Sequence, residues 1–340
     1  MNKSFDHGLL PYLADYDLTP PLEIGTPEQK GVNNANAIVR AGNGDYIARA
    51  YVSKSYDDPA SIEYEHYLLN RLADAKLSFA VPVPVPTRNS ALLCHGTSGR
   101  VSLSRYLPGA RLDPHASNQV ELLGSALGEL QAALRHYPDP PRPGRPLFGE
   151  LFRFPLPLRD PFTVTPQQIG LPDKPPYDEL LRWWREEAAR LQVFLDGPYR
   201  DLPRQLCHND ITPANVLVDT GRVTAVLDFE FAAPAACALD VAMGLRMTMR
   251  VWDDPEPWDA VRHFCRGYAR WMPLTEQEVQ ALPWLIRLRG AIAVLWWLGP
   301  MTAVGETGPI PERIDYLRNF VRWLRDHEQR FVDVMLRATT

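Results

Sequence analysis

The chain has 340 residues, of which 45% are hydrophobic and 23% are charged, and its formal net charge at pH 7 is -5. This composition is typical of a folded globular protein, and the length allows two domains because one domain usually contains about 100–200 residues. The negative net charge excludes a general electrostatic attraction to nucleic acid or to anionic membranes.

The N-terminal part of the chain alternates short strand patterns with one helix. Residues 37–40 and 46–52 have strand patterns, and the Asn43-Gly44 pair between them is expected to supply the positive backbone angles of a tight hairpin. Residues 61–72 carry apolar side chains at helical spacing. These patterns predict a small, β-rich unit with a single helix.

A proline-rich stretch follows this helix. Val81–Pro86 alternates valine with proline, and proline lacks the N–H that a central strand needs, so we expect an extended segment at a sheet edge or on the approach to a strand. Another strand-like run then leads to Pro108-Gly109, a natural break in the chain. We therefore expect residues 1–107 to form an N-terminal lobe.

Beyond residue 107 the patterns are mainly helical. Residues 119–134 and 177–195 predict amphipathic helices, and the proline-dense stretch 138–176 between them predicts an irregular insertion. Further helices follow from Trp258 onward, and together these elements predict a larger C-terminal lobe in residues 108–340. Prolines are expected to separate the last helices, at Pro273, Pro283, Gly299-Pro300 and Pro309.

The sequence indicates a cytoplasmic protein. The N-terminus lacks the apolar run of a signal peptide, and the longest apolar stretch, Ala291–Leu298, is shorter than the roughly 20 residues that span a bilayer. The four cysteines have neither metal-ligand nor redox spacing, and they predict buried thiols in a reducing compartment. We expect no nucleic-acid or membrane partner, and the oligomeric state stays open.

A hairpin of two strands brings polar residues together in the C-terminal half. The expected strands 216–218 and 223–227 are joined by a short turn, so Asn215 at the start of one should lie close to Asp228 at the end of the other. An amide oxygen and a carboxylate that converge in this way suit Mg²⁺. The pattern therefore predicts a magnesium site.

A further carboxylate lies on the loop that enters this hairpin. Asp210 precedes Asn215 by five positions, and phosphoryl transfer needs a carboxylate to orient the attacking hydroxyl, together with metal ligands and a cation for the phosphates. We assign Asp210 as the catalytic base and Asn215 and Asp228 as metal ligands. His208 belongs to the same catalytic set and is expected to support the loop by hydrogen bonds. An ordinary surface hairpin is the alternative, which the Asp-Phe-Glu sequence at hairpin distance disfavours.

These motifs resemble a known group of enzymes. The run from His208 to Asn215, followed by Asp228-Phe229-Glu230, is similar to the catalytic signature of aminoglycoside phosphotransferases, choline kinases and type II homoserine kinases. The segments Gly31–Asn36 and Gly267–Glu276 resemble type II homoserine kinases in particular. The resemblance covers roughly residues 28–300. It implies an α+β, two-lobed, protein-kinase-like fold and an ATP- and Mg²⁺-dependent kinase that phosphorylates a hydroxyl group of a small molecule.

The resemblance also implies a cation on an N-terminal strand, paired with a glutamate on a helix, for the phosphates of ATP. The matching strand carries Arg49 where the family has lysine, and arginine can bind phosphate with two N–H groups. Glu65 is the expected partner, and Glu63 points to another face of its helix. Lys54 is the second candidate for the cation. An ordinary surface ion pair between Arg49 and Glu65 remains the alternative.

Two further segments match the family's nucleotide contacts. Gly31–Asn36 lies where the loop over the phosphates belongs, and its asparagines, among them Asn34, can adopt turns that expose backbone N–H groups. The hinge from Ser104 to Tyr106 is expected to offer backbone groups to adenine. These contacts would make residues 1–107 the nucleotide-binding lobe.

Two positions concern the support of the catalytic loop. Gln131 stands where the family often has a histidine, which puts a histidine-dependent contact in doubt. Asp240 matches a helix-start aspartate that is expected to hold the catalytic loop.

The acceptor is expected to be a small molecule. A protein kinase has glycine where this chain has Glu230, and only eleven residues separate Asp228 from Asp240, which leaves no room for a peptide-docking segment. A non-catalytic nucleotide-binding protein is the alternative, and only the replacement of lysine by Arg49 favours it.

The sequence leaves the acceptor open among amino alcohols, homoserine-like metabolites and aminoglycoside-like antibiotics. Six tryptophans could form a cage for a cationic acceptor or simply pack between helices: Trp252, Trp258, Trp271, Trp284, Trp296 and Trp297. Four acidic residues could attract an amine or form a solvated loop: Asp253, Asp254, Glu256 and Asp259.

Overall fold

The computed structural model describes residues 2–26, 34–51, 59–96, 99–135, 137, 147–150, 163–169, 172–254, 256–296, 298 and 310–339. These residues form two compact units. The first contains the described residues up to 110 together with 217–230, and the second contains the described residues between 111 and 216 and from 231 onward. The expected lobes 1–107 and 108–340 stay a prediction, and most of the expected insertion 138–176 lies outside the described residues.

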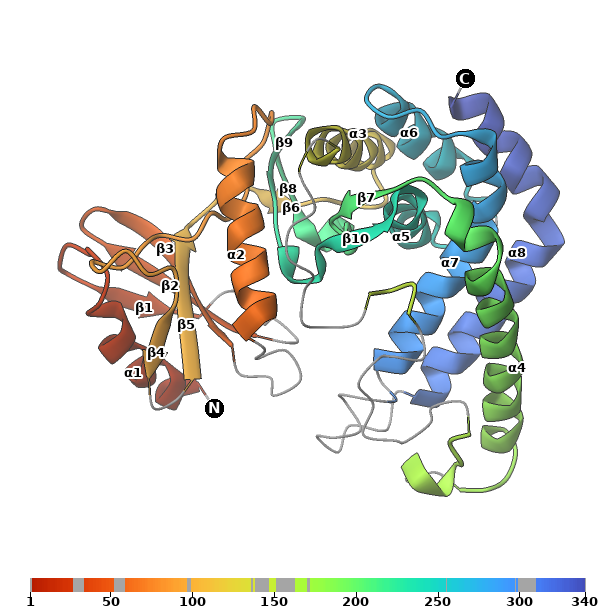
Figure 1. Ribbon diagram of the computed structural model, residues 1–340, viewed down its shortest axis with the longest axis horizontal. Helices are drawn as coiled ribbons and strands as arrows, with labels where there is room; N and C mark the ends of the chain where they lie inside the picture. Colours follow the sequence, from red (N-terminus) through yellow and green to blue (C-terminus); the bar gives the residue numbers. More distant parts are fainter. Residues whose placement is uncertain are drawn as a thin grey trace. The chain divides into compact units, whose positions relative to one another are not determined.

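An antiparallel sheet with the strand order β1-β2-β3-β5-β4 is the centre of the first unit (Figure 1). The predicted hairpin is confirmed as β2 and β3, but only Gly44 has a positive φ, of 131°, and Gly44 already pairs with Ala41. The expectation of positive angles at both Asn43 and Gly44 is therefore wrong. The strands are β1 (Glu23–Gly25), β2 (Ala35–Ala41), β3 (Gly44–Tyr51), β4 (Cys94–Gly96) and β5 (Gly99–Arg105).

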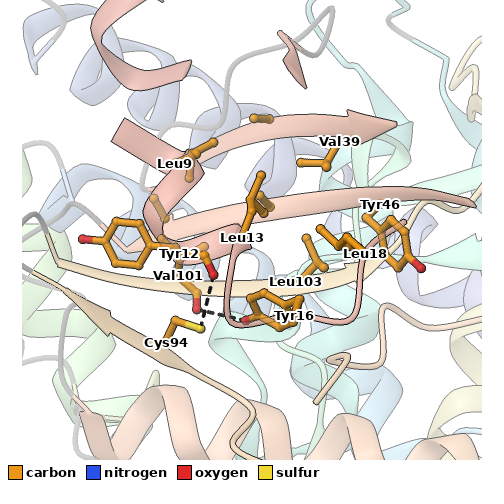
Figure 2. Packing of buried hydrophobic residues seen from close by; sticks show 13 residues of the cluster. Leu9, Tyr12, Leu13, Tyr16, Leu18, Val39, Tyr46, Cys94, Val101 and Leu103 are labelled. Atoms are coloured by element: carbon orange, nitrogen blue, oxygen red, sulfur yellow. Dashed lines mark hydrogen bonds between the residues drawn. The ribbon is translucent and has the colours of Figure 1, made fainter. Parts of the chain in front are cut away.

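One face of this sheet is covered by the first helix, α1 (Asn2–Leu13), which the sequence patterns do not predict. Leu9, Leu13 and Tyr16 pack against buried side chains of β2, β3 and β5, as Figure 2 shows. In β3 the side chains alternate, so Tyr46 and its neighbours at positions 48 and 50 are buried in this core. Arg49 consequently belongs to the opposite face.

The remaining elements of the first unit are a helix and a small sheet. The predicted helix at 61–72 is confirmed as α2 (Pro59–Ala73). The small sheet has the order β6-β8-β9, and β9 is bonded to the backbone of Ala80 through Thr224 O and Val226 N. The stretch Val81–Pro86 forms no regular strand and makes only an isolated bridge at Pro84. The strands are β6 (Ala110–Arg111), β8 (Val216–Asp219) and β9 (Arg222–Val226).

The second unit is mainly helical, with one two-stranded antiparallel sheet formed by β7 and β10 (Figure 1). The predicted helices at 119–134 and 177–195 are confirmed as α3 and α4. Its long elements are α3 (Ser117–Leu134), α4 (Tyr177–Asp196), β7 (Arg204–Cys207), β10 (Ala233–Ala236), α5 (Cys237–Met249), α6 (Trp258–Ala269), α7 (Glu276–Trp296) and α8 (Ile310–Thr339). Short 3-10 turns occupy Gln167–Ile169, Pro198–Asp201, Pro213–Asn215 and Phe229–Phe231.

Helix α7 corrects one expectation. Pro283 lies inside it and does not separate two helices, whereas Pro273 does lie between α6 and α7. The free energy gained by burying the helix offsets the stability lost because proline cannot make the backbone hydrogen bond. By length and composition α7 could cross a membrane, but 78% of its most apolar window is buried inside the protein, as in a core helix. The other expected breaks, Gly299-Pro300 and Pro309, lie outside the described residues.

Two glycines allow α3 and α6 to approach each other closely. A Cβ atom on Gly124 of α3 would lie 2.0 Å from the carbonyl oxygen of Phe264, and one on Gly267 of α6 would lie 2.0 Å from that of Glu121. Real side chains never come so near to backbone atoms. The contact between these helices therefore requires glycine at both positions.

We expect Gly267→Ala to lower the free energy of unfolding by about 3 kcal/mol, because the helices must separate to admit the methyl group. Thermal unfolding followed by circular dichroism measures the loss. Gly8→Ala is the matched control, since a Cβ on Gly8 has nothing within 4 Å. A Gly267→Ala protein as stable as the wild type would contradict the close helix contact.

Candidate functional site

The predicted catalytic residues of the second unit lie on the loop after β7. Asn215 donates both hydrogens of its side-chain amide to Asp210, over 2.9 Å to the backbone oxygen and 3.0 Å to Oδ2 of the carboxylate. The structure thus brings these two predicted site residues together. Because its amide nitrogen is used in this way, the Oδ1 atom of Asn215 is the group left for a cation.

Asp240, in the first turn of α5, holds this loop in place. Its carboxylate accepts hydrogen bonds from the backbone nitrogens of His208 at 2.8 Å and Asn209 at 2.5 Å. Asn209 has a positive φ of 65°, which asparagine tolerates better than most residues, and its side chain donates to the backbone oxygens of Phe231 and Ala233. Burial raises the pKa of Asp240, and its hydrogen-bond donors oppose that shift. The loop before Asp210 is therefore fixed from both sides.

Gln131 links this aspartate to α6. Its amide nitrogen donates to the carbonyl oxygen of Cys237 at 3.0 Å and approaches Asp240 at 3.4 Å, and its Oε1 accepts from the hydroxyl of Tyr268 at 2.6 Å. Glutamine therefore makes a structural contact at the position where the family often has a histidine.

His208 and Arg289 complete the surroundings of Asp210. His208 is fully buried, and its Nδ1 accepts a hydrogen bond from the backbone nitrogen of Asp210 at 3.1 Å, as expected for a supporting residue. The Nη2 atom of Arg289, in α7, lies 3.5 Å from Oδ1 of Asp210. This guanidinium also lies over the ring of Phe148 and against the sulfur of Met243.

Arg289 is a site residue that sequence reasoning missed. A signal for it exists, because Arg287 and Arg289 interrupt the apolar sequence of α7, and a charge in a buried helix needs a polar partner.

The predicted residues of the first unit gather around Arg49. Its Nη1 lies 3.1 Å from Glu65, and its Nη2 lies 3.1 Å from Asp228 and 2.7 Å from Glu230. Burial alone would lower the pKa of Arg49, but the three carboxylates outweigh it and raise the pKa well above its usual value. Glu65 is only 5% exposed, so its contact with Arg49 is no ordinary surface ion pair.

The other residues expected to contact Arg49 or the phosphates of ATP are only partly described by the structure. Glu63 is exposed, which agrees with its position on another face of α2, and Lys54 lies outside the described residues. Asn34 is buried, and its side-chain nitrogen donates to Glu230 at 2.7 Å. Of the rest of the expected phosphate loop, residues 31–33 are also outside the described residues, and residues 35 and 36 begin strand β2.

A histidine beside Glu65 adds no positive charge to this group. The Nε2 atom of His66 lies 3.1 Å from the hydroxyl of Tyr51. Burial, and after it the charge of Arg49, lowers the pKa of His66 to about 4, so the imidazole is neutral near pH 7. In the described part of the chain, Arg49 is consequently the cation that pairs with these carboxylates.

Asp228 has the properties of a metal ligand that works with a bound nucleotide. Its backbone is left-handed, with a φ of 65°, and its side chain is 36% exposed, so one carboxylate oxygen bonds to Arg49 while the group still reaches solvent. No group of three or more His, Cys, Asp or Glu side chains in the described part of the chain could hold a metal ion. Mg²⁺ commonly binds one or two protein oxygens together with phosphates and water, and the partly exposed carboxylate of Asp228 suits such a ligand.

The expected hinge residues lie at and just after the end of β5. Ser104 lies in β5 and pairs with Ile47 of β3, while Tyr106 is 41% exposed. The backbone nitrogen of Tyr106 donates to the oxygen of Asp45 at 2.9 Å. That N–H is therefore engaged, and the hinge can offer a purine only its other backbone groups.

Several of the tryptophans and acidic residues that could contact an acceptor have other partners in the structure, and Trp297 lies outside the described residues. Trp258 stacks on Trp323, and Trp284 stacks on Phe194, which agrees with packing between helices. Trp252 is half-exposed. Three of the four acidic side chains pair with arginines: Asp253 with Arg250, Glu256 with Arg330, and Asp259 with Arg262.

Comparison with known proteins adds to this geometry. Residues 25–280 match the model of a family described as the phosphotransferase enzyme family. The homoserine kinase of Caulobacter vibrioides is 29% identical over 304 residues, which cover 89% of this chain and 88% of that protein.

Solved structures share the fold at low identity. A microcompartment-associated aminopropanol kinase superposes with a TM-score of 0.67 at 20% identity and covers 92% of this chain and 96% of its own. An amicoumacin kinase in complex with AMP-PNP and Ca²⁺ superposes with a TM-score of 0.68 at 13% identity, with coverages of 94% and 96%.

Proposed function

The chain belongs to the phosphotransferase enzyme family, and from this premise we propose that it transfers the γ-phosphate of ATP, with Mg²⁺, to the hydroxyl of a small amino alcohol or hydroxy amino acid. The expected fold, α+β and protein-kinase-like, is confirmed by the solved structures that superpose on it. The expected activity class is confirmed as well: the protein is a kinase of small-molecule hydroxyl groups.

The contact between Asp210 and Asn215 supports this proposal most directly. It fixes the carboxylate of Asp210 on a loop that is clamped by Asp240, as a catalytic base must be fixed before the acceptor arrives. In this mechanism Asp210 orients the acceptor hydroxyl and takes its proton as the hydroxyl oxygen bonds to the γ-phosphorus, while the bond from the γ-phosphorus to the β–γ bridging oxygen breaks and ADP leaves with that oxygen. The carboxyl group then holds that proton until the product leaves.

The other site residues serve the nucleotide. Asn215 Oδ1 and a carboxylate oxygen of Asp228 would hold Mg²⁺, which when bound neutralises charge on the phosphates. Arg49 would bind the phosphates that are not transferred, with Glu65 holding its guanidinium in position. Arg49 makes the glutamate contact expected of the family's lysine. The replacement of lysine by arginine therefore no longer favours a non-catalytic protein. We place this activity in the cytoplasm, where ATP is available.

An acceptor panel tests the proposal. The purified protein is incubated with ATP, Mg²⁺ and one of four alcohols: L-homoserine, 3-aminopropan-1-ol, choline or kanamycin. We expect ADP release, with a phosphorylated product in the mass spectrum, for at least one of the first two. The Asp210→Asn protein serves as the blank. If neither of the first two raises ADP release above that blank, the proposed acceptor class is wrong.

A further inference from the structure

An arginine near the catalytic loop has no counter-charge in the described structure. Arg246, on α5, is half-buried; its Nη1 approaches the sulfur of Met247 at 3.8 Å, and its guanidinium lies 5.5 Å from the ring centre of Tyr316. Its buried Nε atom has no hydrogen-bond partner among the described residues. Thioether and ring are weak partners for a cation that cannot lose its proton.

The charges around Arg246 favour an anion. Burial lowers the pKa of this guanidinium, Arg313 lowers it further, and only Tyr316 opposes them. A buried arginine of α7, Arg287, has the usual carboxylate partner, because Glu187 binds it through two contacts of 2.6 and 2.9 Å. A desolvated charge without such a partner is costly. The surroundings of Arg246 are therefore complementary to an incoming anion.

Arg246 is connected to the proposed base by a short series of contacts. Met243 precedes it on α5 by three residues, about 4.5 Å of helix rise, and the sulfur of Met243 contacts Arg289 at 3.2 and 3.3 Å. Arg289 in turn lies 3.5 Å from Asp210. On α7 the residue after Arg289 is Gly290, where a Cβ atom would lie 3.7 Å from Nε of Arg246. Arg246 thus lies about one helical turn beyond the cation that contacts Asp210.

The separation between Arg246 and the proposed base Asp210 suits a small acceptor with a hydroxyl at one end and an anionic group at the other. A carboxylate matches the planar guanidinium, with two oxygens for two N–H groups. A cationic acceptor would need unpaired carboxylates instead, and three acidic residues considered for that role are already paired with arginines. The positive charge of Arg246 therefore favours hydroxy acids over simple amines as acceptors.

We propose that Arg246 recognises a carboxylate of the acceptor, so that the enzyme selects a hydroxy amino acid over the corresponding amino alcohol. This rests on the proposed function, in which Asp210 receives the acceptor hydroxyl. Arg246 binds substrate, and Arg289 is a positioning residue that holds Asp210.

Two acceptors that differ only in the carboxylate provide the test. L-Homoserine and 3-aminopropan-1-ol share the hydroxyl, the amine and the spacing between them. We expect the wild type to prefer L-homoserine, and Arg246→Met to lower kcat/KM for it about 100-fold, mainly through KM, because a charge-assisted contact is lost. The same variant should change kcat/KM for 3-aminopropan-1-ol, and KM for ATP, by less than about threefold. Arg246→Lys, which keeps the charge, should recover part of the loss.

Arg318→Met is the matched control. Arg318 is also half-buried with an unpartnered Nε, but it is paired with Asp315 on its own helix, α8, and should leave both acceptors unaffected. Equal losses for the two acceptors in Arg246→Met, or a wild type without preference for L-homoserine, would overturn the assignment. A raised KM for ATP would assign the anion to the nucleotide and overturn it too.

Failure of the proposed function gives a different result. If neither acceptor is phosphorylated, calorimetry of L-homoserine binding in the presence of AMP-PNP still decides the matter. Binding to the wild type that is lost in Arg246→Met, with unchanged thermal midpoint, upholds the carboxylate site although the transfer proposal fails. No binding to the wild type overturns both.

Discussion

Asp210→Asn should lower kcat at least about 10³-fold while KM for ATP and the thermal midpoint stay nearly unchanged, because general-base catalysis contributes about 10²–10⁴-fold. Asparagine keeps the size of the side chain and an oxygen that can accept the hydrogen bond from Asn215, so the loop should keep its shape. What is lost is the group that takes the acceptor's proton. Steady-state kinetics with the preferred acceptor of the panel measure the effect.

The control for this variant lies on the hairpin that follows the loop of Asp210. Asp219 ends β8 and is exposed, so Asp219→Asn changes the net charge equally without touching the loop. It should keep wild-type kcat. An Asp210→Asn enzyme that retained most of its turnover would show that another group is the base.

Asp228→Asn is expected to remove Mg²⁺-dependent nucleotide binding and to lower kcat/KM by about 10³-fold, since a metal ion contributes several kcal/mol and each 1.36 kcal/mol is tenfold in rate. Asparagine tolerates the left-handed backbone at this position, so the substitution removes the charge without straining the chain. Calorimetry of ATP binding with Mg²⁺ and with EDTA measures the difference.

Glu230→Gln provides the comparison. Glu230 contacts Arg49 at 2.7 Å and accepts from Asn34, so it supports the cluster and is not expected to bind the metal. Its variant should lose much less affinity for MgATP than Asp228→Asn. The reverse order would make Glu230 the metal ligand.

The contacts that the sequence predicts correctly are those set by local geometry. Asp210 and Asn215 are predicted members of one site on one loop, and the structure adds the hydrogen bond between them. The alternation of β3 places Arg49 on the face opposite the buried Tyr46, toward Glu65, as the predicted pairing of Arg49 with Glu65 requires. Strand alternation and short spacings decide both cases. The partnership of Asn215 with Asp228 in one metal site stays a prediction, because the two residues belong to different units.

The contacts that the sequence could not predict depend on helix packing. Arg289 reaches Asp210, and Arg246 has no carboxylate partner among the described residues, because α5 and α7 lie side by side in a register that no local pattern specifies. The same packing keeps Pro283 inside a continuous helix, against the usual preference of proline. Tertiary burial overrides the local signal in each case.

The pairing of β9 with Ala80 has a consequence for the synthesis of the protein and for the design of fragments. The backbone N–H and the backbone oxygen of Ala80 are both hydrogen-bonded to β9. Two of the three carboxylates that pair with Arg49 belong to residues 228 and 230. A ribosome that has synthesised only the first 107 residues has not yet supplied these partners. A fragment cut there would keep Glu65 alone for Arg49 and would lack the strand that bonds to Ala80. The N-terminal unit is therefore completed only after the chain has been translated through Glu230, and expression fragments must retain the hairpin.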